Sequence, residues 1–480
     1  MLLHSGGLGA TDGYDASVYY AASTALLNGR LPYRNYFLLH PPGIVLALSP
    51  FAAIGQITSD RAGFMLATLG FIALGSVNAV LVRSVGLRMG LAPGAALVGG
   101  LFYAVWVGAA SSEHLIKLEV LGNFLLLLAL RCYLAKSKGT ATRHLLLAGL
   151  ALGAAIATKI WFVVPCALVL MWEVATSRSW VRSRALLLGA AISVVAITGP
   201  FFAAAPRAIW RMVVLDQLGR PNVNPLVWRL GYMSTASIFH PSAAASTLWW
   251  FVAVAALVIA SMCVVAWRAP CGRLPAALLV AHLGVLVAAP SYYPFYNDYY
   301  AAPLAIVVAA TVHVVVARVP RSVPRRTKWA AVVALAVTVV AGAAAAIYVP
   351  KSTMIAFPSQ LTSAVAGSRC IMADTPVVLI ELNVLTRDLR RGCRNWIDVT
   401  GPTYGRDAAE LHGPWVIRAD NPQWQRDLRQ YLYSGDAFIV FRAADTGIGP
   451  QLRRKLATTP ILAQAGDVIV YCARRALCHR

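Results

Sequence analysis

Residues 11–43 read TDGYDASVYYAASTALLNGRLPYRNYFLLHPPG and hold two of the chain's 19 acidic residues, Asp12 and Asp15. Asp15 comes directly before a helix-forming run, 16–27, which ends at Asn28-Gly29, a pair typical of a helix C-terminus. A carboxylate in that place caps the first amides of the helix and faces the positive end of its dipole. The two prolines of His40-Pro41-Pro42-Gly43 favour the start of a second helix. The stretch therefore predicts two short helices with an acidic group at the start of the first.

The composition indicates a membrane protein. Hydrophobic residues make up 59% of the 480 residues, and charged residues only 13%. Ordinary soluble domains do not have this composition, and repeated apolar runs long enough to cross a bilayer indicate several membrane spans. The 42 Lys and Arg against 19 Asp and Glu give a net charge of +23. Because membrane proteins concentrate such charge in short cytoplasmic loops, we expect no nucleic-acid partner.

Ten apolar segments are predicted to span the membrane: 62–82, 92–110, 118–134, 145–157, 160–176, 185–204, 246–267, 274–290, 301–317 and 329–349. Five clusters of Arg and Lys lie in alternate connections between these segments, and the positive-inside rule places all five in the cytoplasm. The other loops and both chain ends then lie outside. The apolar run 44–54 is too short to span and would reverse this order, so we expect it at the outer interface.

The last part of the chain is less apolar and reads as a small α/β domain outside the membrane. Strand-like runs at 370–373, 437–441 and 467–471 alternate with helical runs such as 423–433. Four cysteines lie here, Cys370, Cys393, Cys472 and Cys478, and of the three possible pairings Cys370–Cys393 is the first choice. No Cys-x-x-Cys spacing is present, so we expect no zinc site. The predicted domains are 1–61, a catalytic loop with juxtamembrane helices, 62–349, the transmembrane domain, and 350–480.

The order of Asp15, Tyr19, Gly29 and His40-Pro41-Pro42 resembles the first extracytoplasmic loop of the GT-C superfamily. The resemblance is to its branch of protein O-mannosyltransferases and lipid A aminoarabinose transferases, which use polyprenyl-phosphate sugars. Two positions depart from the family pattern: Ala16 stands where a second acid is usual, and His40 where Lys is usual. The family also has a spanning helix before this loop, so we expect the true start of the chain to lie upstream of Met1.

The resemblance implies a polytopic α-helical membrane protein of GT-C-like fold, with about ten spans as given, the first one missing, and a small C-terminal extracytoplasmic α/β domain. It implies an inverting glycosyltransferase, a hexosyl- or pentosyltransferase. Its partners would be an outward-facing polyprenyl-phosphate-linked sugar, membrane lipid, and a cell-envelope glycan, glycolipid or protein as acceptor. The sequence does not indicate whether a divalent metal is needed. Two alternatives remain: a transporter or flippase of lipid-linked sugars, and a non-catalytic envelope-assembly protein with the same fold.

Sugar transfer from a phosphate needs a base at the acceptor hydroxyl and cations at the leaving phosphate, because charge develops at both. Asp15 is the candidate base, with helix capping as its alternative role. Asp12 is either a second carboxylate or a solvated loop residue. His40 is a candidate acceptor or cavity residue. No group is predicted to bind a metal.

The donor phosphate has candidate ligands in two regions. Residues 149–165 resemble the family's glycine-rich span ending in Thr-Lys at the outer face, which makes Lys159 a candidate ligand or an interfacial anchor. The predicted outer loop 205–245 adds Arg207, Arg211, Arg220 and Arg229, and an Arg can bind a phosphate with two hydrogen bonds. From this loop Arg207 and Arg211 are our candidates.

Further ionisable residues are predicted at the outer ends of spans. Glu113, Lys117 and Glu119 suggest a polar cavity, with Lys117 as a phosphate ligand; alternatively, Lys117 snorkels beside Glu113. Tyr296 and Asp298 belong to SYYPFYNDYYAAP, residues 291–303, which is either part of this cavity or an aromatic belt at the interface.

Overall fold

The computed structural model describes residues 14–135, 141–177, 179–220, 225–239, 244–318, 357–404 and 415–473. The chain forms two compact units, which are described separately. The bundle unit comprises residues 1–7, 70–199 and 224–351, and the sheet unit comprises residues 8–69, 200–223 and 352–480. Two long helices, α3 (Asp60–Arg88) and α9 (Trp180–Ala204), have residues in both units.

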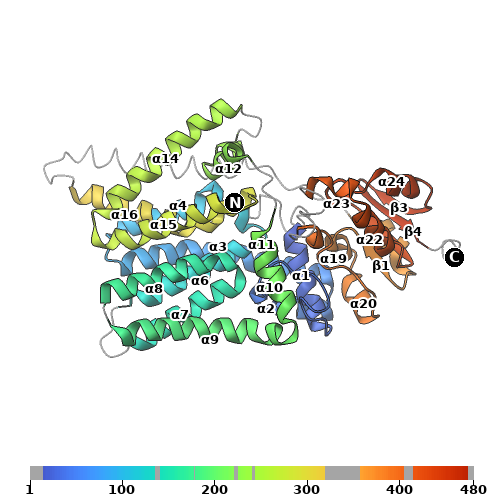
Figure 1. The fold of residues 1–480 in the computed structure, drawn as a ribbon, viewed down its shortest axis with the longest axis horizontal. Coiled ribbons are helices and arrows are strands. Elements are labelled where there is room, and N and C mark those ends of the chain that lie inside the picture. Colours follow the sequence, from blue (N-terminus) through green and yellow to red (C-terminus); the bar gives the residue numbers. More distant parts are fainter. Residues whose placement is uncertain are drawn as a thin grey trace. The chain divides into compact units, whose positions relative to one another are not determined.

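The bundle unit is helical, and its long helices are drawn with their labels in Figure 1. Besides parts of α3 and α9, it contains α4 (Pro93–Val105), α5 (Val107–Glu113), α6 (Leu118–Tyr133), α7 (Ala141–Thr158), η3 (Ile160–Phe162), α8 (Val163–Ser177), α12 (Leu226–Met233), α13 (Ala236–Phe239), α14 (Ala245–Trp267), α15 (Pro270–Ala288), η5 (Pro294–Tyr300) and α16 (Ala301–Arg318). Within the described ranges, six helices are long and apolar enough to cross a membrane. A seventh span results if α4 and α5, which meet at a bend of 54°, are counted as one. The protein is therefore a multi-pass membrane protein.

Nine of the ten predicted spans coincide with helices, and the tenth, 329–349, lies outside the described residues. Predicted span 92–110 is broken at Trp106, where the backbone is extended between α4 and α5. The helix α6 has only 16 residues. The run 44–54 forms α2 (Gly43–Ile57), whose 15 residues are fewer than the roughly 20 that a normal span requires. Its place at the outer interface stays a prediction.

Glycines allow two helices of the bundle to approach closely. A Cβ atom added to Gly149 or Gly153 of α7 would collide with backbone atoms of Leu186 or Ala190 in α9. Small residues at four-residue spacing are a common means of packing membrane helices, because they remove the side chain that would keep two backbones apart. The glycine-rich sequence of α7 is thus explained by its contact with α9.

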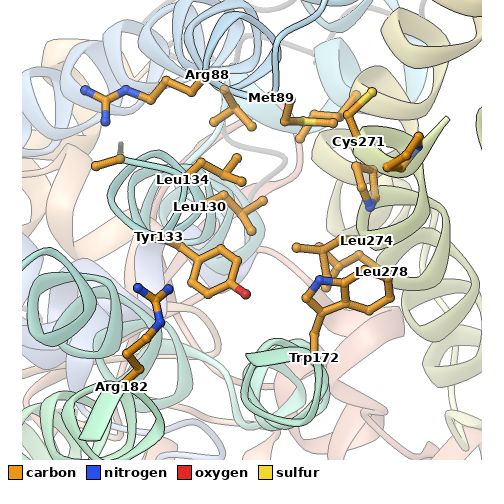
Figure 2. Close-up of a pocket in the computed structure, with 15 residues that line it drawn as sticks. Arg88, Met89, Leu130, Tyr133, Leu134, Trp172, Arg182, Cys271, Leu274 and Leu278 are labelled. Atoms are coloured by element: carbon orange, nitrogen blue, oxygen red, sulfur yellow. The ribbon is translucent and has the colours of Figure 1, made fainter. Parts of the chain in front are cut away.

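A cavity of about 360 Å³ lies where several helices of the bundle unit carry basic residues at their ends. Figure 2 shows Arg88 and Arg182 on one side of it with Tyr133 between them, and Trp172 and Leu278 across from them. Arg182 donates to Glu173 at 2.6 Å, and Arg88 donates to the carbonyl oxygen of Arg131 at 2.9 Å. The cavity brings together the C-terminal ends of α3 and α6 and the N-terminal ends of α9 and α15. Basic clusters far apart in sequence therefore share one end of the bundle, as the positive-inside argument requires.

The sheet unit combines three separate stretches of the chain. The first supplies α1 (Tyr14–Leu27) and α2, and the second supplies α10 (Pro206–Trp210), the π-helical η4 (Arg211–Leu215) and α11 (Asp216–Leu218). The C-terminal stretch supplies α18 (Ser359–Ala366), β1 (Ile371–Ala373), α19 (Pro376–Glu381), α20 (Leu385–Arg390), η6 (Gly401–Tyr404), η7 (Trp415–Asp420), α22 (Pro422–Leu432), β2 (Ala437–Val440), α23 (Ala443–Thr446), α24 (Pro450–Ala457), β3 (Ile461–Ala465) and β4 (Val468–Cys472). The four strands form one mixed sheet in the order β1-β2-β4-β3. Strands β1 and β2 are parallel, and the other two pairs are antiparallel.

The predicted strands and the helix at 423–433 are confirmed as β1, β2, β4 and α22. Sequence reasoning missed β3, an edge strand in which only Ala463 is fully buried, so that it lacks the apolar pattern of its neighbours. The predicted Cys370–Cys393 disulfide is present. Cys472 is also disulfide-bonded, whereas Cys478 lies outside the described residues.

The helix after Asp15 forms as predicted, but α1 is described from Tyr14, so Asp15 lies in its first turn instead of before it. Its end is confirmed: Gly29 takes the left-handed conformation, at φ = 76°, that favours glycine at a helix C-terminus. Pro42 then precedes α2 as its N-cap residue. Several contacts join this N-terminal stretch to the C-terminal one. Among them, Asp60 accepts hydrogen bonds from Thr386, and Arg61 pairs with Glu381 at 3.1 Å.

Candidate functional site

In the sheet unit, Asp15 lies close to a second carboxylate that the sequence did not single out, Asp398. Tyr14, the residue before Asp15, donates its hydroxyl to Asp398 Oδ1 at 2.9 Å, and the amide of Gly401 donates to the same oxygen at 2.9 Å. The amide of Thr400 in turn donates to the Tyr14 hydroxyl at 3.0 Å. The start of α1 is thereby attached to the loop that follows α20.

Electrostatics links the two carboxylates. Burial raises the pKa of Asp398 to about 6, and the negative charge of Asp15 acts in the same direction, whereas the Tyr14 hydrogen bond and the positive charge of Arg220 lower it. Asp15, in the first turn of α1, faces the positive end of the helix dipole, which favours its ionised form. The site thus combines two carboxylates in different environments with an arginine, an arrangement suited to proton transfer.

The other predicted residues of the sheet unit lie on neighbouring segments. The ring of His40 contacts Tyr19 of α1 edge to face, with 5.8 Å between ring centroids, and its carbonyl oxygen accepts the Tyr33 hydroxyl at 2.6 Å. Gln217 of α11 donates to the carbonyl oxygen of Leu39 at 2.6 Å, which attaches the arginine-bearing stretch to this loop. Asp12 lies outside the described residues.

Three arginines of the predicted loop 205–245 belong to the sheet unit, and they differ in their surroundings. Arg207 is exposed, and Arg211 is exposed with its Nε 3.9 Å from Asp216 Oδ1. Arg220 is half-buried near Asp398. The fourth predicted arginine, Arg229, belongs to the bundle unit and donates to the carbonyl oxygens of Val287 and Ala289. Because those groups lie at the C-terminal end of α15, Arg229 caps that helix.

A second group of ionisable residues is buried in the bundle unit. Lys159 forms an ion pair with Glu119, and the two side chains are only 2% and 1% exposed. The Lys159 ammonium also lies 3.8 Å from the ring centroid of Trp161 and 4.1 Å from that of Tyr296. A carboxylate and two aromatic faces therefore surround it, as desolvation of a lysine requires.

Polar side chains continue from this ion pair toward the other predicted residues. Tyr103 donates to Glu113 at 2.7 Å, and Asn123 donates to the carboxylate and the backbone carbonyl of Asp298, at 3.0 Å and 2.7 Å. The amide of Asn123 also lies 3.4 Å from the Tyr103 hydroxyl, so one network joins the two carboxylates. Lys117 lies over the ring of Phe295, 3.6 Å from its centroid.

The structure thus brings Glu113, Glu119, Lys159, Tyr296 and Asp298 into one buried region of the bundle unit, as the predicted polar cavity requires. Asp15, His40, Arg207 and Arg211 belong to the sheet unit. Over the described parts of the chain, no group of three or more His, Cys, Asp or Glu residues is placed to hold a metal ion.

No family model matches the sequence, and neither does any curated protein. Among solved structures, ArnT from Cupriavidus metallidurans bound to undecaprenyl phosphate is similar over 96% of this chain and 94% of its own, with a TM-score of 0.51 and 15% identity. The chain has an ArnT-like fold. Apo ArnT matches over the same shares with a TM-score of 0.53. An oligosaccharyltransferase from Archaeoglobus fulgidus, in complex with zinc and sulfate, matches 89% of this chain and 64% of its own, with a TM-score of 0.50 and 12% identity. These proteins are GT-C glycosyltransferases, so the predicted GT-C-like fold is confirmed.

Proposed function

We propose that this protein is a membrane-bound glycosyltransferase that moves a sugar from a polyprenyl phosphate to an acceptor of the cell envelope. The supporting observation is the ArnT-like fold over almost the whole chain, in a relative solved with undecaprenyl phosphate. Undecaprenyl phosphate is the lipid that remains when a polyprenyl-phosphate sugar gives up its sugar. The same kind of donor therefore suits this chain.

In this proposal Asp15 is the general base. It accepts the proton of the acceptor hydroxyl while the oxygen forms a bond to the anomeric carbon and the bond from that carbon to the phosphate oxygen breaks. Attack from the face opposite the phosphate inverts the anomeric configuration. Asp15 has the setting that a base needs, because it lies at a helix N-terminus, beside a second carboxylate, and in the half-buried part of α1.

The leaving phosphate gains negative charge and needs cations. Arg207 and Arg211 are exposed, and a guanidinium can bind two phosphate oxygens at once. Lys117 and Lys159 remain proposed phosphate ligands, although Lys159 would have to exchange its carboxylate partner Glu119 for the phosphate. The proposal includes no step through a metal.

The test is transfer of radiolabelled sugar from purified polyprenyl-phosphate sugars to envelope fractions by the full-length protein in lipid nanodiscs. We expect Asp15→Asn to lower the rate at least about a hundredfold, because a positioned base typically contributes a factor of 10²–10⁴. The matched control is Asp445→Asn, whose carboxylate is 64% exposed and pairs with Arg442. Most of the wild-type rate should remain in that control.

Two outcomes would contradict the proposal. Retention of most of the activity in Asp15→Asn would remove Asp15 as the base. Movement of the lipid-linked sugar across the bilayer, without a new glycosidic bond in any envelope fraction, would identify a flippase instead.

A further inference from the structure

A cavity of about 450 Å³ lies in the sheet unit and includes Asp398 in its lining. One wall comes from the loop after α1 and the other from the loop after α20, and it is lined by Arg30, Asn35, Tyr36, Phe37, residues 394–398 and Pro402. Its volume is within the range of small-molecule sites, about 300–1,000 Å³. The cavity is therefore large enough for a small organic group.

The walls of this cavity are fixed by contacts that do not depend on a ligand. Arg30 donates to the carbonyl oxygen of Cys393, and Cys393 is held by the disulfide to Cys370. Trp396 stacks on Tyr431 with the rings 4.2 Å apart and nearly parallel, at 8°. A preformed cavity loses little entropy when it binds a ligand, because its side chains are already ordered.

The aromatic and polar side chains that line this cavity are of the kinds that bind a sugar ring. Three aromatic side chains, Tyr36, Phe37 and Trp396, offer apolar surface to the C–H face of a sugar ring, and planar polar groups accompany them. Among those, Asn395 is 4% exposed and its Nδ2 donates to the carbonyl oxygen of Ile371, while its Oδ1 has no hydrogen-bond partner among the described residues. Because Asn395 is buried this deeply, the polar side chains that a bound sugar can reach are Arg394, which is exposed, and Asp398, which is half-buried.

Asp398 connects this cavity to the candidate base. Its carboxylate lines the cavity, accepts the hydroxyl of Tyr14, and interacts with the charge of Asp15. A ring bound here would thus have its hydroxyls close to the start of α1. The polyprenyl donor reaches the protein from the lipid phase. This cavity is built instead by the loop after α1 and the C-terminal α/β domain, which makes the acceptor, and not the donor, the ligand to consider.

We propose that this cavity binds a sugar ring of the acceptor, which makes the acceptor a glycan or glycoconjugate, and that it directs one hydroxyl of that ring to Asp15. In this assignment Arg394 donates to ring hydroxyls, Asp398 accepts from them, and Phe37 packs on the ring. The inference rests on the proposed function, because it names the acceptor class for the same site.

The experiment measures sugar binding without donor, so that binding is separated from turnover. Saturation-transfer NMR is recorded on the full-length protein in detergent with the methyl glycosides of mannose, galactose, arabinose and glucuronic acid. We expect at least one glycoside to bind the wild type, and Arg394→Gln and Phe37→Ala each to weaken that binding at least tenfold. Asp15→Asn should keep it. The matched control is Arg391→Gln: this exposed arginine lies three positions before Arg394 and outside the cavity.

The outcomes separate the cavity from the catalytic proposal. Binding that both cavity variants lose, in a protein that transfers no sugar, would support the cavity and contradict the glycosyltransferase. Transfer with an unchanged acceptor KM in both cavity variants would overturn the cavity and keep the enzyme. The acceptor site is also overturned if none of the four glycosides binds the wild type. Thermal unfolding of each variant, compared with Arg391→Gln, identifies a loss of binding caused by misfolding.

Discussion

The structure changes the interpretation of Lys159 and Glu119 more than that of the other predicted site residues. They are 40 positions apart, and both side chains are almost completely buried in one ion pair. Local spacing instead suggested Lys117 and Glu113, which are four positions apart, as an ion pair. The sequence could identify Lys159 and Glu119 as unusual charges in an apolar region, but only the packing of α6 against the segment after α7 shows that they are partners.

We predict that this ion pair stabilises the bundle unit and that its members cannot be replaced singly. Lys159→Gln should destabilise the protein by about 3–5 kcal/mol, because Glu119 is left as an uncompensated buried charge. The double variant Glu119→Gln/Lys159→Gln should recover most of that loss. Thermal unfolding in detergent measures both. If the double variant were no more stable than Lys159→Gln alone, loss of the ion pair would not explain the lower stability. The KM of the double variant for the donor is a separate measurement, and it reports on phosphate binding.

Asp374 shows how a single buried carboxylate couples folding of the C-terminal domain to pH. It is completely buried and accepts the backbone amides of Phe441, at 3.0 Å, and Arg442, at 2.7 Å. Burial raises its pKa to about 6, with those hydrogen bonds acting in the opposite direction. The folded state therefore holds the proton more tightly than the unfolded state, whose carboxyl has a pKa near 3.8. Stability from this group is complete below pH 3.8 and is lost as the pH rises through about 6.

We predict that the C-terminal domain loses up to about 3 kcal/mol of stability between pH 4 and pH 7 through Asp374. Asp374→Asn should flatten this dependence, because an amide does not titrate in that range. Near pH 4 the variant should be about 1 kcal/mol less stable than the wild type, because one hydrogen bond is lost. Near pH 7 it should be the more stable of the two, because the wild type then buries an ionised carboxylate. Proteolysis of the full-length protein during heating, at several pH values, follows unfolding of this domain. Asp445→Asn, at an exposed position, is the control. An unchanged slope in Asp374→Asn would contradict the assignment.

At the scale of elements, the contact of α7 with α9 depends on the absence of side chains at Gly149 and Gly153. We predict that Gly153→Ala destabilises the protein by about 1–3 kcal/mol, because the added methyl group must push two helix backbones apart. The control is Gly284→Ala in α15, where an added Cβ would meet no atom within 4 Å. That change should be neutral or slightly stabilising, since Ala is the better helix former. Unfolding temperatures in detergent compare the two, and equal effects would argue against tight packing of α7 on α9.

The start or end of a helix can be predicted from the sequence when a residue at that position determines it. The end of α1 at Gly29 and the start of α2 after Pro42 follow from single residues with fixed backbone preferences, and both are confirmed. The break between α4 and α5 at Trp106 has no Pro or Gly at the break itself to mark it. Asp398 was missed for a similar reason: it lies in a loop of ordinary composition, and only its contact with Tyr14, 384 positions away, gives it a place in the candidate site.

At the scale of the whole molecule, hydropathy and charge were enough to predict a multi-pass membrane protein with a small C-terminal sheet domain. They do not show that residues 8–69 and 200–223 join residues 352–480 in one unit. That grouping depends on contacts between distant positions, such as Asp60 with Thr386 and Gln217 with Leu39. Such contacts involve specific hydrogen-bond partners, which composition and periodicity cannot identify.

The sidedness of the molecule is the prediction on which the proposed acceptor depends. The basic ends of several helices meet at the cavity of Figure 2, and from the positive-inside rule we predict that this end faces the cytoplasm. Two exposed positions test this: Ser434 in the C-terminal domain and Arg273 near the start of α15. In a Cys271→Ser background, we predict that a membrane-impermeant maleimide labels Ser434→Cys in intact cells.

The same reagent should label Arg273→Cys only after the cells are permeabilised, because that position belongs to the basic end of the bundle. The reverse pattern would place the C-terminal domain in the cytoplasm. The cavity beside Asp398 belongs to the same unit as that domain, so it would then have no access to an envelope glycan. The acceptor proposed here would be excluded even if sugar transfer were observed, which makes this labelling the first experiment to perform.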